Sequence, residues 1–137
     1  MTFARFTVAY WCVLAAALLP LACAYLAKFQ DFGKPRSQGG YDNHAPREWL
    51  ARQEGWKARA NAAQANTFEA LPFFFAAVII AHQLGAPQTL LDILALLFVT
   101  LRIIYAAMYV AGMPKTRSAI WAAAFLVNIA ILLSAWR

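Results

Sequence analysis

Four long apolar stretches dominate this sequence of 137 residues, at about 6–28, 58–84, 90–111 and 118–136. As a helix, each is long enough to cross the ~30 Å hydrocarbon core of a bilayer, which needs about 20 residues. Hydrophobic residues make up 63% of the chain, and a soluble fold this small has no room to bury them. The sequence therefore predicts an all-α integral membrane protein, a single domain over residues 1–137 with four transmembrane helices.

The longest connection, residues 30–57, is polar and contains several glycines and prolines. Within it we expect a short helix over Pro46–Glu54, because proline is favoured in the first turn of a helix. Trp49, Leu50 and Trp56 predict that this piece rests on the membrane interface, where tryptophan is common.

The net charge is +6, and a basic patch can indicate nucleic-acid binding. Here, however, the basic residues gather in the connections and flanks of the apolar stretches. One side of the membrane carries Lys28, Lys34, Arg36, Arg47, Arg52, Lys57, Arg59, Lys115 and Arg117, and the other carries Arg5 and Arg137. The positive-inside rule then predicts a cytoplasmic loop 30–57 and external termini. The partner that this pattern indicates is a lipid bilayer and not nucleic acid.

The two cysteines, Cys12 and Cys23, both lie in the first apolar stretch. Eleven residues of helix separate them by about 16 Å, which is too far for a disulfide within one chain. His44 and His82 have no second ligand at metal-binding spacing. We therefore expect free cysteines and no metal site.

Two ionisable residues interrupt the apolar stretches at similar depth. Glu69 lies about 16 Å and Arg102 about 15 Å from the side of the basic loop, given the rise of a helix. Charges inside membrane spans persist when they are paired, solvated or buried in a bundle. Glu69 and Arg102 therefore predict an ion pair or a shared polar site between neighbouring helices. The alternative is a purely structural pair that sets the helix register.

Other polar and aromatic residues share a helix face with this pair, since they recur every three, four or seven residues. They are Arg59, Asn66 and Glu69; Arg102, Tyr105 and Tyr109; and Arg117, Trp121, Phe125 and Asn128. We infer a polar, cationic cavity that opens to the cytoplasm and suits an anionic ligand. As alternatives, the tyrosines belong to an interfacial aromatic belt and Asn128 forms an interhelical hydrogen bond.

Residues 59–74 read RANAAQANTFEALPFF. The element Asn-x-x-Glu followed by Pro, here Asn66, Glu69 and Pro72, resembles the signature of the MAPEG family, the membrane-associated proteins of eicosanoid and glutathione metabolism. Arg102-x-x-Tyr105-x-x-x-Tyr109 and Arg117-Ser118 also resemble the family, as do four helices with a long first loop. The resemblance covers essentially the whole chain, which looks like a bacterial-type member.

The resemblance implies a homotrimer in the bacterial inner membrane that binds glutathione between protomers, near the cytoplasmic face. It implies a transferase or peroxidase in which glutathione, the co-substrate, reacts with a lipophilic small molecule. Arg117 then matches the arginine that stabilises the glutathione thiolate. The glutathione-binding positions correspond to Lys28, Arg59, Asn66, Glu69, Arg102, Tyr105 and Tyr109.

The sequence also departs from the family pattern. Active members usually carry an arginine four residues before the asparagine, where this chain has Ala62, and Arg59 lies about one turn earlier. Trp121 stands where a tyrosine is often found. The alternative function is therefore a non-catalytic membrane protein of the same fold that binds a lipid, a small ligand or a partner protein.

Overall fold

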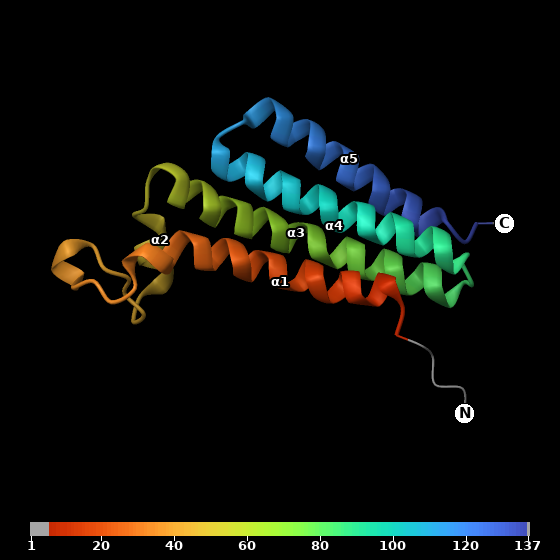
Figure 1. Cartoon of the computed structure of the whole chain (residues 1–137), viewed down its shortest axis with the longest axis horizontal. Coiled ribbons are helices and arrows are strands. Elements are labelled where there is room, and N and C mark those ends of the chain that lie inside the picture. Colours follow the sequence, from red (N-terminus) through yellow and green to blue (C-terminus); the bar gives the residue numbers. More distant parts are fainter. Residues whose placement is uncertain (1–5, 137) are drawn as a thin grey trace.

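The structure, a computed structural model, describes residues 6–136 of the chain and consists of helices joined by short links and one long loop (Figure 1). Arg5 and Arg137, on which part of the charge argument depends, lie outside the described residues. The helices are α1 (Val8–Lys28), α2 (Pro46–Ala51), α3 (Gly55–Gln83), α4 (Gln88–Ala111) and α5 (Pro114–Leu133). Two short 3-10 helices, Phe29–Asp31 and Arg36–Gln38, lie in the loop. The all-α prediction is confirmed.

Helices α1, α3, α4 and α5 are long and apolar enough to cross a membrane. They run alternately up and down, so that the start of α1, the α3–α4 turn and the end of α5 lie at one end (Figure 1). The long loop with α2 and the link between α4 and α5 lie at the other end, which we call the loop end. Helices α3 and α4 form the centre, with α1 on one side and α5 on the other.

Several helix boundaries differ from the predicted ones. Helix α5 begins at Pro114 and not at Ser118, because proline in the first turn lacks only an N–H that has no partner inside the helix. Helix α4 begins at Gln88, two residues earlier than predicted. It ends at Ala111, as predicted, because the next residue, Gly112, has a φ of 75°, the left-handed conformation that glycine adopts without strain. Helix α3 begins at Gly55, three residues earlier than predicted.

Small side chains allow the helices of the core to approach one another closely. Ala63, Ala77 and Ala95 are fully buried, and small residues at helix contacts favour packing in membranes. The rings of Phe74 and Phe98 stack between α3 and α4 with centroids 4.2 Å apart. Large aliphatic side chains lie instead on the outer faces of the bundle, where lipid covers them.

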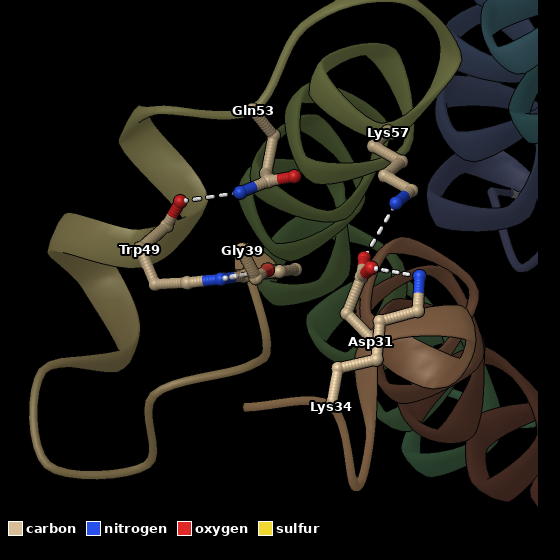
Figure 2. Close-up of polar contacts among 6 residues, drawn as sticks. All are labelled: Asp31, Lys34, Gly39, Trp49, Gln53 and Lys57. Carbon is tan, nitrogen blue, oxygen red and sulfur yellow. Dashed lines mark hydrogen bonds and ion pairs between the residues drawn. The ribbon is translucent and has the colours of Figure 1, made fainter. Parts of the chain in front are cut away.

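Asp31 links the end of α1 to the loop and to the start of α3. Its buried carboxylate accepts hydrogen bonds from Lys34, at 2.9 Å, and from Lys57 (Figure 2). Lys34 lies three residues away, whereas Lys57 belongs to α3. Because both cations share one carboxylate, the loop is held against the two helices that it connects.

Trp49 of α2 fixes the interior of the loop. It is only 3% exposed, and its indole N–H donates to the carbonyl of Gly39 at 3.3 Å (Figure 2). Gln53 donates to the carbonyl of Trp49, and the ring of Tyr41 meets the indole edge-on. Trp49 therefore packs inside the loop and does not itself face the membrane interface, and α2 is shorter than predicted, ending at Ala51. Cys12 and Cys23 are free, as predicted.

Candidate functional site

Arg102 is the most deeply placed cation among the described residues. It is 2% exposed and lies about 14 Å from the end of α4, given the rise of a helix. One terminal N–H₂ group of its guanidinium donates to Asn66 Oδ1 at 3.0 Å and to Thr67 Oγ1 at 3.1 Å, both on α3. The guanidinium also lies over the ring of Tyr105, 4.2 Å from its centroid. These contacts offset part of the cost of burying a charge.

Glu69 reaches Arg102 only through Asn66. Asn66 Nδ2 donates to Glu69 Oε2 at 3.5 Å, and among the ion pairs of the described residues none joins Glu69 to Arg102. Of the two arrangements predicted from their equal depth, the structure has the shared polar site and not the direct ion pair. The reason is that the neutral side chains of Asn66 and Thr67 lie nearer to the guanidinium than the exposed carboxylate.

Asn66, Glu69 and Arg102 line a cavity between α3, α4 and α5 of about 220 Å³, which we call the inner hollow. Its full lining is Asn66, Glu69, Ala70, Phe73, Phe98, Arg102, Trp121, Ala124, Phe125 and Asn128. Phe98, Arg102 and Asn128 are buried, whereas Glu69, Trp121 and Phe125 are exposed. The inner hollow is therefore open between α3 and α5 and has α4 behind it.

A second cavity, of about 190 Å³, lies nearer the loop end, and we call it the outer hollow. It is lined by Asn66, Tyr105, Arg117, Ser118 and Trp121. The two hollows adjoin, because Asn66 and Trp121 line both.

Arg117 supplies the positive charge of the outer hollow. Its guanidinium lies 4.1 Å from the ring centroid of Tyr109, and Tyr109 meets Tyr105 edge-on. The tyrosines therefore connect Arg117 at the loop end with Arg102 deeper in the bundle. If a ligand with a thiol group entered the outer hollow, the positive charge of Arg117 would favour the thiolate, which is the nucleophilic form of a thiol.

Two of the predicted site residues lie elsewhere. Arg59 Nε donates to the carbonyl of Val110 at 2.9 Å, so that its charge stands at the C-terminal end of α4, where the helix dipole favours cations. Lys28 lies over the ring of Tyr41 in the loop, 5.0 Å from its centroid. Neither residue lines either hollow. Sequence spacing placed them correctly at the loop end but did not determine where their long side chains point.

One residue, Thr67, has a place in the site that was not predicted. Thr67 accepts a hydrogen bond from Arg102 and donates one to the carbonyl of Ala63. The sequence signal that could have indicated its role is a polar side chain between the site residues Asn66 and Glu69. Asn128 was expected to form an interhelical hydrogen bond. It is 2% exposed, and its Oδ1 has no hydrogen-bond partner in the part of the chain that the structure describes. That expectation is wrong for the amide oxygen.

The model of the MAPEG family matches residues 8–136, nearly the whole chain. The chain belongs to the MAPEG family. It is thus an integral, multi-pass membrane protein of the family associated with glutathione and eicosanoid metabolism. Comparisons with curated proteins and with solved structures found no match.

Membership in the MAPEG family gives the two hollows a chemical context. The outer hollow combines an arginine, a serine and tyrosine and tryptophan rings, which suit a polar anionic molecule. The inner hollow of this MAPEG protein is lined mainly by apolar side chains around a small polar group, which suits a lipophilic molecule. Among the described residues, no three acidic, histidine or cysteine side chains come together as a metal site would require.

Proposed function

We propose that this protein is a membrane-bound glutathione-dependent transferase or peroxidase that acts on lipophilic electrophiles. The observation that carries the proposal is the pair of adjoining hollows, one cationic at the loop end and one mainly apolar inside the bundle. A reaction between a water-soluble thiol and a lipophilic molecule needs both kinds of surface next to each other.

Glutathione would bind with its thiol near Arg117 and its carboxylates near the basic residues of the loop end. Asn66 and Glu69 would hold its amide and amino groups, with Tyr105 and Tyr109 beside it. A thiol with a pKa of about 8.5 is mostly protonated at neutral pH. The charge of Arg117 would raise the thiolate fraction, and Arg102 would keep Asn66 in position through their hydrogen bond.

The protein is proposed to form a homotrimer with glutathione bound between protomers. Detergent-solubilised protein should then bind glutathione at millimolar concentration or below in calorimetric titration, and light scattering of that sample should give the mass of three protomers. The matched control ligand is a tripeptide in which serine replaces the cysteine, since it tests the thiol separately from the charges. Absence of glutathione binding would refute the enzymatic proposal.

A non-catalytic membrane protein of the same fold is the second candidate. The observation that favours it is the absence of an arginine at position 62, where the chain has Ala62. Arg59 does not replace it, because its Nε is bound to the carbonyl of Val110. This candidate would be favoured if the protein binds glutathione but neither conjugates it to a lipophilic substrate nor reduces a lipophilic peroxide.

The loop end is proposed to face the cytoplasm of a bacterial inner membrane. Nine of the twelve Lys and Arg residues belong to this end or its flanks, and such an excess marks the cytoplasmic side. A reporter fused after the last residue should therefore be active on the external side only. Two fusions of the same reporter serve as controls. The fusion in the Gly85 turn should be active on the external side, and the fusion in the loop should be active in the cytoplasm. A cytoplasmic signal from the C-terminal fusion would contradict the orientation.

A further inference from the structure

The inner hollow contains two polar atoms that the protein itself leaves unpaired. Arg102 Nε and Asn128 Oδ1 are buried and have no hydrogen-bond partner among residues 6–136, and both residues line the same cavity. A buried polar group without a partner destabilises the folded protein. Two such groups in one hollow can be satisfied by one small molecule that forms a hydrogen bond with each.

The two atoms have opposite requirements. Arg102 Nε–H needs an acceptor, and the amide oxygen of Asn128 needs a donor. A hydroxyl group, whose oxygen accepts and whose O–H donates, meets both requirements. A carboxylate would face the amide oxygen of Asn128 and the nearby Glu69, and an ammonium group would face Arg102. The charges around the hollow therefore select a neutral group.

The rest of the lining is hydrophobic. Phe73 and Phe125 meet across the gap between α3 and α5, with ring centroids 5.8 Å apart, and Trp121 stacks on Phe125. Trp121 and Phe125 are each 43% exposed on helices long enough to cross the membrane, so that an apolar chain lying against them can continue into lipid. The cavity of about 220 Å³ holds the head group and the first part of such a chain.

We infer that the inner hollow binds a neutral lipophilic molecule with a hydroxyl group, which accepts from Arg102 Nε and donates to Asn128 Oδ1 while its chain lies along Phe73, Trp121 and Phe125. The inference rests on the proposed function only for the role of this molecule as the co-substrate. Binding itself needs no glutathione, because its contacts are with Arg102, Asn128 and the three aromatic rings, whereas the contacts proposed for glutathione in this hollow are with Asn66 and Glu69.

The test uses the full-length protein in nanodiscs without glutathione and four probes of equal chain length: bromoundecanol, bromoundecane, bromoundecanoate and bromoundecylamine. Bromine quenches tryptophan fluorescence on contact. The signal of Trp121 is taken as the difference between the protein and its Trp121→Phe variant. Affinities are expressed against the mole fraction of probe in the bilayer, so that partition into lipid cancels.

The alcohol should bind at least about thirtyfold more tightly than the alkane, since it gains one hydrogen bond to a charged group and one to an amide. It should also bind more tightly than the carboxylate and the amine. Equal binding of alcohol and alkane would show that water or nothing satisfies the two atoms and would overturn the inference. Preference for the carboxylate would overturn the hydroxyl assignment.

Asn128→Leu tests the acceptor. Affinity for the alcohol should fall about three- to tenfold, while affinity for the alkane is unchanged. Without probe, the variant should unfold at a higher temperature than the original protein, because a buried unpaired amide is removed. A lower unfolding temperature would mean that Asn128 has a structural partner and would overturn the inference. Thr100→Val also replaces a polar side chain by an apolar one, but on an exposed face of α4. It should change neither the affinity for the alcohol nor the unfolding temperature.

These outcomes separate the inference from the proposed function. Alcohol selectivity without any glutathione binding would support a lipid-binding hollow and refute the glutathione-dependent enzyme. Glutathione binding without alcohol selectivity would leave the proposed function standing and refute this inference.

Discussion

Removing both acceptors of Arg102, in the double variant Asn66→Leu/Thr67→Val, should destabilise the protein by about 3–5 kcal/mol. The guanidinium is 2% exposed, and Asn66 Oδ1 and Thr67 Oγ1 are its only hydrogen-bond acceptors among the described residues. The variant leaves a buried positive charge without those bonds. Unfolding in detergent, followed by circular dichroism against denaturant concentration, measures the loss.

Thr67→Val alone should cost about 1.5–3 kcal/mol, the range for one hydrogen bond to a charged group. Thr100→Val is its matched control. Both threonines donate to the carbonyl four residues earlier in their own helix, Thr67 to Ala63 and Thr100 to Leu96, but only Thr67 also accepts from Arg102. The difference between the two variants therefore isolates the bond to Arg102.

Adding Arg102→Met to the double variant should restore most of the lost stability, because the charge that lacked partners is then gone. If the triple variant is as unstable as the double one, the loss comes from poor packing at positions 66 and 67. The proposed cost of the unpaired guanidinium would then be wrong.

Arg117→Ala should weaken glutathione binding about ten- to a hundredfold, the equivalent of about 1.5–3 kcal/mol for a hydrogen bond to a charged group. It should also raise the pKa of the bound glutathione thiol, because a positive charge nearby favours the thiolate and its removal favours the neutral thiol. The midpoint of thiolate absorbance against pH should therefore move to higher pH. Calorimetric titration gives the affinity.

Two further variants make this result specific. Lys115→Ala removes the same charge two residues earlier in α5, at an exposed side chain that lines neither hollow, and should leave affinity and thiol pKa nearly unchanged. Glu69→Gln should weaken binding of the amino end of glutathione and spare the thiol pKa. A thiol pKa that stays constant in Arg117→Ala would exclude Arg117 as the thiolate stabiliser. Arg102 would then be the next arginine to test, since Arg59 is bound to the carbonyl of Val110.

The membrane fold follows from local sequence. The structure confirms the predicted all-α architecture, and the family match confirms the predicted membership in the MAPEG family. The physical reason is that lipid acts on each apolar stretch separately: about 20 apolar residues span a bilayer as a helix whatever their neighbours are. Glycine and proline also act locally, which is why the links at Gly85 and Gly112 fall close to their predicted places. The fourth helix begins at Pro114, four residues before its predicted start.

The contacts of the long polar side chains were decided only by tertiary structure. Depth along a helix placed Glu69 and Arg102 at one level, but the rotation of α3 against α4 decided that Asn66 and Thr67 meet the guanidinium. Arg59 and Lys28 lie at the expected end, yet their flexible side chains contact Val110 and Tyr41. Helical periodicity specifies a face, whereas a hydrogen bond depends on a few tenths of an ångström and on which of several acceptors is nearest. For the same reason, the sequence placed Asn128 on the polar face of α5, and only the packing of α3, α4 and α5 leaves its amide oxygen without a partner.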